Sequence, residues 1–391
     1  MFDVVISGAG PAGCKSAEIL AKAGFKVALL EKNTNWRKPC GGGVSSRIFK
    51  YYPQLRKHDY HKINGVSMYS SDYDNLEYSW GGIRESSINV DRLEFDNVIR
   101  NVAIDSGAEL FDKHVSYDFI YKDGKKVGIK AKSKSGSIDF LGKILIAAGG
   151  MSSKLANKSG LRKKWQINDM YQAKCAIMEG ELSLDTAKIS LFFQKYKGYG
   201  WIFPLKDNHF NIGCGTCNED NSKYNLNEVY NNFLKTPFIK KILSGSNYKT
   251  HWSGAYPMPG AGVIDRALYG DNLMIIGDAA GFVSPISGEG IHPSIVSGEA
   301  AAYSAINALE NEIISKESLK SYKKYPNVKK IIRNFKMKLS LVEFFFENKG
   351  KQLNALFKLA KSDDMYREEV INMFLFNKPL SKELLQILKT T

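Results

Sequence analysis

Hydrophobic residues near the start of the chain follow two different periods. Residues 4–6 form a continuous apolar run, which is typical of a strand buried on both faces. Residues 16–24 then place apolar side chains at helical spacing and end in a glycine, as many helices do. Residues 26–31 return to a short apolar run that closes with an acid. The pattern predicts a strand, a helix and a second, neighbouring strand.

Later segments predict a second sheet and a helical end. Residues 143–148 and 273–276 are apolar runs that end in glycines, so we expect two more buried strands there. Alternating apolar and polar residues predict strands over 65–70, 76–80 and much of 171–217, and a three-stranded meander over 115–141. Apolar residues at helical spacing predict helices over 88–103, 226–243 and most of the chain after 312. A chain of 391 residues with 43% hydrophobic content can support this arrangement.

The order of these elements predicts three parts. We expect a discontinuous cofactor-binding domain over 1–62, 88–164 and 258–310, an inserted β-sheet domain over 63–87 and 165–257 that binds the substrate, and a helical C-terminal region over 311–391. The inserted segments interrupt the first domain twice. Pro326 and residues 361–364 are the expected breaks between the C-terminal helices.

A Gly-x-Gly-x-x-Gly turn joins the first strand to the first helix. Gly8 would make the turn, Gly10 would admit a pyrophosphate, and Gly13 would let the helix pack on the strand. Pro11 and Ala12 open the helix, whose N–H groups and positive end attract phosphate. The alternative is a glycine-rich turn in another kind of strand-to-helix unit. The context favours a dinucleotide site.

Two other segments point to the same ligand. Glu31, 18 residues after Gly13, suits a carboxylate that accepts from ribose hydroxyls, although a solvated charge at a strand end is the alternative. Asp278 follows Gly277 at the end of another buried strand, where parallel sheets bind ligands. Together they indicate FAD. The further residues that we assign to this cofactor are Lys32, Cys40, Gly41, Gly42, Arg92, Val115, Ala148, Gly149, Gly288, Gly290 and Ile291.

Three of these assignments have their own reasons. The N–H groups of Gly288, Gly290 and Ile291 begin a helix and would stabilise negative charge on a reduced flavin. Arg92 opens the helix after the inserted strands and is expected to contact the cofactor, with a surface arginine as the alternative. Val115 is expected to touch adenine through its backbone.

The electron source is left open by the sequence. Residues 120–260 contain no second glycine fingerprint after a strand, so a nicotinamide donor, NAD(P)H, must bind transiently, or a protein such as ferredoxin must deliver the electrons. Cys214 and Cys217 have the spacing of a metal or redox pair, but no second pair accompanies them, so we favour a structural role and expect no metal.

The net charge of +15 suggests an anionic surface or substrate. Basic residues are dense over 316–338 and lead into the apolar, aromatic run 339–346. This is typical of a helix lying on anionic lipid headgroups, and equally of a lysine-rich solvated face beside a core helix. No nucleic-acid-binding motif accompanies the charge. The sequence shows no secretory signal and no membrane-spanning run, so we expect a cytoplasmic protein with reduced thiols. Because of the basic segment, the inner face of the cell membrane is the alternative location.

Three motifs together resemble one family. Residues 38–44, residues 198–204 with Gly213 and Gly215 beyond them, and residues 277–291 are similar to the geranylgeranyl reductases, and the resemblance runs over residues 1–305. It implies the p-hydroxybenzoate-hydroxylase-like fold: an α/β, Rossmann-like FAD-binding domain of the glutathione-reductase type with an inserted antiparallel sheet. It also implies saturation of C=C bonds in isoprenoid chains. Gly149 stands where many relatives carry Asp, and His292 also departs from the usual pattern.

The chemistry of that reaction fits particular side chains. An alkene reductase must hold an apolar chain against the flavin, deliver a proton and exclude water. Period two places Tyr199, Trp201 and Phe203 on one strand face, and with Pro204 and His292 they are our predicted substrate residues, although an ordinary core face is the alternative. Cys40, Tyr199 and Trp201 are the predicted catalytic residues, with a small packing role as the alternative for Cys40.

The leading hypothesis is an FAD-dependent reductase that acts on a prenyl chain in a lipid, a quinone or an isoprenoid diphosphate. An aromatic hydroxylase or a halogenase of the same fold is the alternative among enzymes. An electron-transfer flavoprotein without an organic substrate pocket is the alternative from another class.

Overall fold

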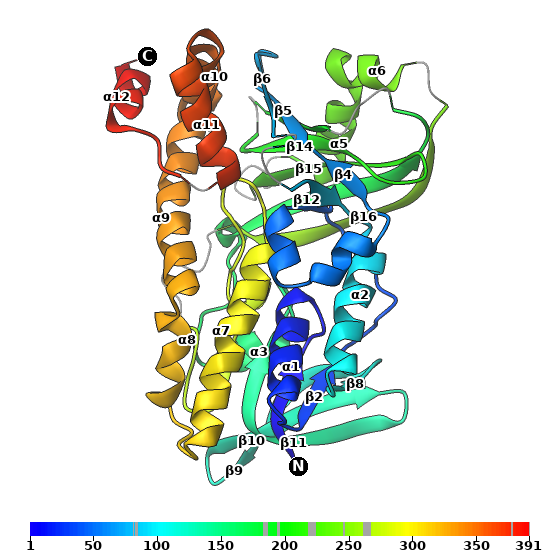
Figure 1. The fold of residues 1–391 in the computed structure, drawn as a ribbon, viewed down its shortest axis with the longest axis vertical. Helices are drawn as coiled ribbons and strands as arrows, with labels where there is room; N and C mark the ends of the chain where they lie inside the picture. Colours follow the sequence, from blue (N-terminus) through cyan, green and yellow to red (C-terminus); the bar gives the residue numbers. More distant parts are fainter. Residues whose placement is uncertain are drawn as a thin grey trace.

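Two large sheets and a long helical region make up the structure (Figure 1). The computed structural model describes residues 1–390 except 81, 83–84, 183–186, 194–195, 218–223, 245–246, 261–266 and 377. The first sheet carries the N-terminus at one end of the molecule, and the second sheet lies toward the other end. The C-terminal helices run from one to the other.

The first sheet is parallel at its centre, as the apolar runs predict. Its order is β8 (Glu109–Phe111), β2 (Val27–Leu30), β1 (Phe2–Ser7), β11 (Gly136–Ala147), β10 (Lys125–Ser133) and β9 (Val115–Lys122), with β17 (Leu273–Ile275) also paired to β11. Ser7 lies opposite both Leu30 and Ala147, and Ala147 lies opposite Ile275. The segments that follow these residues therefore emerge at one edge of the sheet.

β11 is longer than the sequence pattern predicts. The meander over 115–141 forms as β9, β10 and the first part of β11, with the expected turns. However, β11 continues without a break into the buried run that we expected to be a separate strand. Gly142 allows this because a Cβ there would lie 2.6 Å from the side chain of Val5, so no larger residue fits between β11 and β1.

Three helices cover the first sheet, namely α1 (Pro11–Lys22), α2 (Arg92–Asp105) and α7 (Ile291–Glu310). α1 packs closely on α7, because a Cβ on Gly298 would lie 2.2 Å from the backbone oxygen of Ala12. The helix expected from residue 88 begins at Arg92 instead, because Ser87–Asn89 pairs as strand β7 and the Asp91 carboxylate caps the N–H of Leu93 at 2.8 Å.

The second sheet has the order β16 (Lys249–Pro259), β12 (Met170–Glu179), β15 (His209–Cys217), β14 (Gly198–Pro204), β13 (Ala187–Phe192), β5 (Gly65–Tyr69) and β6 (Asn75–Ser79). It is antiparallel except where β13 pairs with β5 in parallel. That pairing joins the two inserted segments, which lie far apart in the chain. α5 (Leu226–Lys235) and α6 (Pro237–Leu243) pack on one face of this sheet.

Short elements connect the two sheets. A small sheet contains β3 (Gly43–Val44), β7 and β4 (His61–Ile63). The other short elements are α3 (Lys154–Lys158), η1 (Ser46–Lys50), η2 (Pro53–Lys57), η3 (Ile167–Asp169), η4 (Gly277–Ala279), η5 (Ser318–Lys320) and η6 (Glu347–Gly350).

The C-terminal region is helical, as predicted: α8 (Ser321–Lys324), α9 (Pro326–Phe346), α10 (Lys351–Ser362), α11 (Asp364–Phe376) and α12 (Lys382–Thr390). α9 begins at Pro326, and the break between α10 and α11 falls at Asp363, where breaks were expected. Leu341 and Phe345 of α9 join one core with Val66 and Met68 of β5. The aromatic run after the basic segment therefore packs on protein. Among the described residues, no helix combines the length and the apolar character needed to cross a bilayer.

Candidate active site

One cavity of about 800 Å³ lies where the two sheets meet. The predicted residues that line it are Gly8, Gly10, Pro11, Ala12, Glu31, Lys32, Cys40, Gly41, Gly42, Arg92, Val115, Ala148, Gly149, Tyr199, Trp201, Phe203, Gly277, Asp278, Gly288, Gly290 and Ile291. Three predicted residues, Gly13, Pro204 and His292, are not among the lining residues. The structure thus gathers segments almost 300 residues apart around a single space.

The glycines of the N-terminal turn have the geometry that a dinucleotide turn requires. Gly8 has φ +109°, and a Cβ there would lie 2.4 Å from the oxygen of Ala148. A Cβ on Gly13 would lie 1.9 Å from the oxygen of Gly8, so Gly13 packs beneath the turn and not into the cavity. Among the residues that the structure describes, no atom lies within 4 Å of the Cβ position of Gly10, and no side chain caps the helix that follows. The free N–H groups of α1 suit a phosphate.

Glu31 is anchored at the end of β2. Its Oε2 accepts the N–H of Ala9 at 2.8 Å, and its Oε1 accepts the N–H of Asn33 at 3.2 Å. Val115, which is 41% exposed, lines the same end of the cavity. The carboxylate is therefore part of the turn, and not a freely solvated charge.

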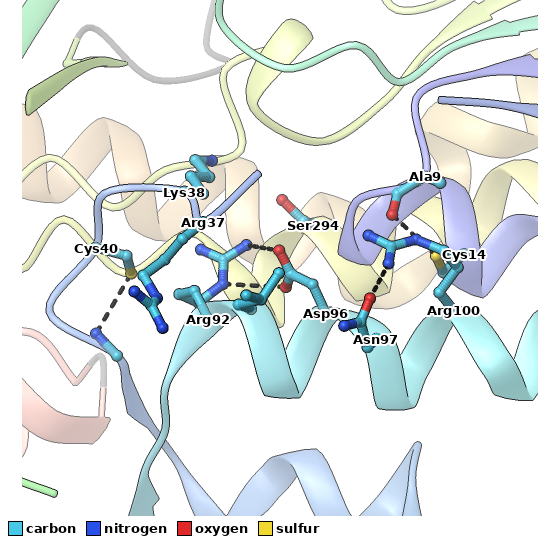
Figure 2. Close-up of polar contacts among 12 residues, drawn as sticks. Ala9, Cys14, Arg37, Lys38, Cys40, Arg92, Asp96, Asn97, Arg100 and Ser294 are labelled. Atoms are coloured by element: carbon cyan, nitrogen blue, oxygen red, sulfur yellow. Dashed lines mark hydrogen bonds and ion pairs between the residues drawn. The ribbon is translucent and has the colours of Figure 1, made fainter. Parts of the chain in front are cut away.

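Arginines follow one face of α2 toward the turn (Figure 2). Arg92 donates twice to Asp96, Nε to Oδ1 at 3.0 Å and Nη2 to Oδ2 at 2.9 Å. Burial alone would lower the pKa of Arg92, but Asp96 and Cys40 together raise it above its ordinary value, so the guanidinium stays charged. Arg92 is 4% exposed and is not a surface arginine.

Arg100, two turns further along α2, was missed from the sequence. It lines the cavity and donates to the side chain of Asn97 (Figure 2). Its Nε is buried and has no hydrogen-bond partner in the part of the chain that the structure describes. A buried donor without a partner is costly, and an anionic group beside the turn would satisfy it. The spacing of Arg92, Asp96 and Arg100 by four residues was the available sequence signal.

Lys38 is a second residue that was not predicted. Its Nζ lies 2.6 Å from Oδ2 of Asp278, and both side chains line the cavity. Burial by itself would lower the pKa of Lys38, but the nearby Asp278 carboxylate more than offsets this and raises it. Ser294 of α7 also donates to Asp278, at 3.4 Å. The strand end at Gly277 thus presents a paired carboxylate and ammonium to the middle of the cavity.

The segment that carries Cys40 lies directly on β14. Nδ2 of Asn211 donates to the backbone oxygen of Cys40 at 2.9 Å, and Oδ1 of Asn211 accepts from the indole of Trp201 at 2.8 Å. A Cβ on Gly41 would lie 2.9 Å from the ring of Phe203. The thiol sulfur of Cys40 accepts the N–H of Gly42 at 3.4 Å. Glycines next to Cys40 therefore permit the contact between this segment and the aromatic strand.

Tyr199, Trp201 and Phe203 do share one face of β14. Their ring centroids are spaced by 5.9 and 6.2 Å along the strand. A Cβ on Gly213 of β15 would lie 2.4 Å from the Trp201 ring. Gly213 on the neighbouring strand therefore makes room for the indole, whereas a Cβ on Gly215 would lie 3.9 Å from that ring, at ordinary contact distance. The structure thus explains why Gly213 accompanies the aromatic motif.

The loop before α7 is held from several sides. The hydroxyl of Tyr199 donates to the oxygen of Ser287 at 2.6 Å, and burial raises the pKa of that hydroxyl well above its ordinary value. Tyr171 of β12 donates to the oxygen of Pro285 at 3.0 Å. Nζ of Lys338, on α9, lies 3.4 Å from Oγ of Ser284. The predicted flavin-facing loop is thereby tied to the second sheet and to the C-terminal region.

The remaining predicted residues lie away from the cavity wall. The oxygen of Pro204 accepts from Asn89 at 2.7 Å. His292 packs its ring against Tyr51 at 5.7 Å, and burial lowers the pKa of His292 to about 4. Cys214 and Cys217 are buried in β15. Across the described residues, no cluster of three or more histidine, cysteine or acidic side chains could hold a metal.

A small apolar space lies beside the aromatic wall of the cavity. A space of about 50 Å³ lies between the second sheet and helices α9, α10 and α11. Phe192, Tyr199, Trp201 and Phe374 border both spaces. These aromatic side chains therefore contact both the main cavity and the apolar space beneath the C-terminal helices.

These features define a flavoprotein whose FAD-binding cavity lies at the carboxyl ends of parallel strands. The family model described as FAD binding domain matches residues 1–325, and the chain belongs to this family. The residues that would hold the cofactor are those of the N-terminal turn, Glu31, Asp278 and the start of α7.

The relatives narrow the group. The chain is 26% identical to digeranylgeranylglycerophospholipid reductase 2 of Methanopyrus kandleri, covering 95% of this chain and 94% of the relative. It is 28% identical to digeranylgeranylglycerophospholipid reductase 1 of Methanosphaera stadtmanae, covering 99% and 96%. These matches confirm the predicted resemblance to the geranylgeranyl reductases.

Solved structures confirm the predicted fold class. A geranylgeranyl bacteriochlorophyll reductase-like protein from Thermoplasma acidophilum has a TM-score of 0.85 at 23% identity and covers 100% of this chain and 98% of its own. A flavin-dependent brominase has a TM-score of 0.76 at 20% identity, with coverage of 100% and 97%. At these identities the likeness concerns the fold alone.

Proposed function

We propose that the protein is an FAD-dependent reductase that saturates C=C bonds of a geranylgeranyl or other polyprenyl chain. The observation that carries this proposal is the aromatic wall that the flavin cavity shares with an apolar space beneath the C-terminal helices. Relatives similar over almost the full length are named as reductases of a lipid with geranylgeranyl chains. The substrate class is therefore a prenyl chain in a lipid, a quinone or an isoprenoid diphosphate.

The walls of the cavity suit such a chain. Tyr199, Trp201 and Phe203 offer contiguous aromatic surface, and Phe192 and Phe374 extend it toward the C-terminal helices. Burial of apolar surface contributes about 25 cal/mol per Å², so a prenyl chain gains most of its binding energy from such a wall. The same wall excludes water from the reacting bond.

FAD, when bound, supplies the hydride for this reaction. Of the protein's own residues, Cys40 is the proposed proton donor, because its Sγ accepts from Gly42 and leaves the thiol hydrogen free to point elsewhere. The Tyr199 hydroxyl already donates to Ser287, so its proposed role is to fix the loop and the ring. Trp201, held by Asn211, would position the chain.

The charges in the cavity fit the same chemistry. Arg92 stays protonated next to Cys40, and the start of α7 points its N–H groups toward the same region. Both would favour negative charge on a reduced flavin. Arg100 and the free N–H groups of α1 would hold the pyrophosphate, and Glu31 the ribose.

Two further parts of the proposal concern partners. The electrons would come from NAD(P)H or from ferredoxin, bound transiently. An anionic membrane surface would suit a lipid substrate. Because the aromatic run of α9 is buried, the exposed basic face of that helix, with Lys329, Arg333 and Lys336, would make the contact.

The brominase likeness keeps one alternative in view, a halogenase or an aromatic hydroxylase of the same fold. Those enzymes need a reduced flavin that reacts with oxygen, so slow reoxidation in air would count against them. An electron-transfer flavoprotein needs no substrate pocket, and the apolar space argues against that role.

The decisive experiment is anaerobic incubation of the dithionite-reduced protein with geranylgeranyl lipids, geranylgeranyl diphosphate and menaquinone, followed by mass spectrometry. We expect one of these to gain two hydrogens per reduced bond. A reduced flavin that leaves all of them unchanged, and that is rapidly reoxidised by air, would move the assignment to the halogenase and hydroxylase group.

A further inference from the structure

A lysine interrupts the apolar stripe of α9. The buried residues of this helix recur at helical spacing, and they are Val328, Phe335, Lys338, Leu341, Val342 and Phe345. Five of the six are apolar, and Lys338 lies as deep as they do, at 1% exposed. A buried charge is costly, and an apolar side chain would fill the same position without that cost. The charge of Lys338 therefore calls for a functional explanation.

The ammonium of Lys338 contacts the loop that precedes α7. Its Nζ lies 3.4 Å from Oγ of Ser284, and the same Oγ accepts the N–H of Ser287 at 3.5 Å. The N–H of Ser284 donates to the oxygen of Glu289 at 2.9 Å, so the loop closes on itself at this point. Residues 286–290 of the loop line the flavin cavity, whereas Lys338 is not among the lining residues. The charge therefore acts on the cavity through this loop.

The charges that act on Lys338 compensate each other. Arg47 of η1 donates through Nη2 to both carboxylate oxygens of Glu289, at 2.9 and 3.2 Å. Glu289 acts to raise the pKa of Lys338 and Arg47 to lower it, and burial lowers it to about 8, so the amine stays protonated at pH 7. Within the described residues, Lys338 itself has no ion-pair partner. These three side chains therefore carry one net positive charge beside the loop.

We propose that Lys338 is a positioning residue for the reduced flavin: it holds the loop 284–290 and places behind it a positive charge that stabilises the anionic reduced cofactor. The inference rests on the proposed function, because it concerns the flavin of that reaction. The N–H groups at the start of α7 face the same end of the cavity, so Lys338 adds a full charge to a partial one. A reduced flavin stabilised in this way persists until a sparingly soluble prenyl chain arrives.

Reduction creates the negative charge that Lys338 would stabilise. The oxidised flavin ring takes up two electrons and one proton, so the reduced form carries one net negative charge. Two unit charges about 10 Å apart, at an effective dielectric constant of about 20, change an equilibrium constant about tenfold. For a two-electron couple, a tenfold change corresponds to about 30 mV. Lys338 should therefore raise the midpoint potential of the bound flavin by about that amount.

The test is a reductive titration of the FAD-loaded full chain against a reference dye, without oxygen and without prenyl substrate. Lys338→Met removes the charge, so it should favour the oxidised flavin about tenfold relative to the wild type, which lowers the midpoint potential by about 30 mV at pH 7. Lys338→Gln keeps a hydrogen-bond donor without the charge, and it should show the same decrease. The visible spectrum of the oxidised flavin verifies that each variant folds and holds its FAD.

The pH dependence identifies the charge as the cause. The potentials of the wild type and of Lys338→Met should converge between about pH 8 and 10, because Lys338 loses its proton there, and reduction raises its pKa by about one unit through the reciprocal coupling. Lys122→Met is the matched control, because it removes the same charge from an exposed site at the far end of β9. It should leave the midpoint potential unchanged.

Three results would overturn the inference. The first is a midpoint potential of Lys338→Met equal to that of the wild type. The second is a wild-type potential in Lys338→Gln, since a donor without charge would then be sufficient. The third is a difference between the wild type and Lys338→Met that is the same at pH 7 and at about pH 10, because a charge that has titrated away cannot cause it.

The potential and the prenyl assay separate this inference from the proposed function. If the potential of Lys338→Met falls as described but the dithionite-reduced wild type saturates no prenyl chain, the role of Lys338 stands and the function fails. If prenyl chains are reduced but the potentials do not differ, the function stands and the role of Lys338 is overturned.

Discussion

Lys338 is a charge that the fold retains at a cost in stability. This residue of α9 is 1% exposed, and within the described residues its ammonium makes a single long contact, of 3.4 Å, with Oγ of Ser284. Burial lowers the pKa of Lys338 from 10.5 to about 8, while Glu289 acts to raise it and Arg47 to lower it further. We therefore expect Lys338→Met, which keeps the length and removes the charge, to stabilise the protein.

The magnitude follows from the change in pKa. The difference between 10.5 and about 8 corresponds to about 3 kcal/mol, since one pKa unit is worth about 1.4 kcal/mol. Below pH 8 the amine is protonated in both states, and the folded state bears the whole penalty. Between pH 8 and 10.5 the folded protein binds fewer protons than the unfolded chain, so stability rises with pH. Above pH 10.5 the penalty is gone.

Urea unfolding of the FAD-free wild type and of Lys338→Met, from pH 7 to 10.5, checks this. The difference between the two proteins cancels the titration of all other groups. It should favour the variant by about 3 kcal/mol at pH 7 and shrink toward zero at pH 10.5. Lys336→Met, on the exposed face of α9, should change stability by less than about 0.5 kcal/mol. A difference that does not change with pH, or a variant less stable at pH 7, would refute the reasoning.

Other predictions concern the site itself. Arg100→Gln should weaken FAD binding about tenfold in a fluorescence titration, because it removes the buried Nε that we expect to donate to an anionic group of FAD. Unchanged affinity would contradict that role. Gly213→Ala should destabilise the fold by about 1–3 kcal/mol and slow prenyl reduction, because its Cβ would lie 2.4 Å from Trp201. Gly215→Ala is the control, because the nearest contact of its Cβ would be 3.7 Å. Equal effects of the two substitutions would contradict the explanation. Cys40→Ala should slow prenyl reduction about a hundredfold or more while FAD stays bound, and Cys40→Ser should have an intermediate rate. Full activity of Cys40→Ala would exclude the thiol as proton donor.

The parts of the site that the sequence predicts are those built from local geometry. Gly8 and Gly13 reveal their roles because the turn, the strand and the helix are consecutive. Asp278 was predicted because ligands gather at the carboxyl ends of parallel strands, and the register of β1, β11 and β17 brings those ends together. Local rules and one general rule of sheet topology were sufficient for these residues.

The parts that the sequence does not predict depend on long-range contacts. Asn211 joins Cys40 to Trp201 across 171 positions of the chain, and nothing in the local pattern of β15 distinguishes that asparagine. The parallel pairing of β13 with β5 likewise joins separate insertions. Lys38 stood inside a recognised motif, yet its partner Asp278 lies 240 residues away. Such residues become visible only when the chain is folded.

The basic and aromatic segment shows why amphipathic pattern alone leaves two interpretations open. A helix that lies on lipid and a helix that packs on protein need the same separation of charged and apolar faces. In the structure, Phe345 of α9 is 2% exposed and belongs to one core with Phe357 of α10 and Met68 of β5, so protein already covers the apolar face. Phe374 of α11 belongs to the same core and also borders the cavity. The C-terminal helices border the apolar end, while the predicted FAD residues lie in other elements. We therefore expect substitutions in these helices to change the length of prenyl chain that is reduced without weakening FAD binding.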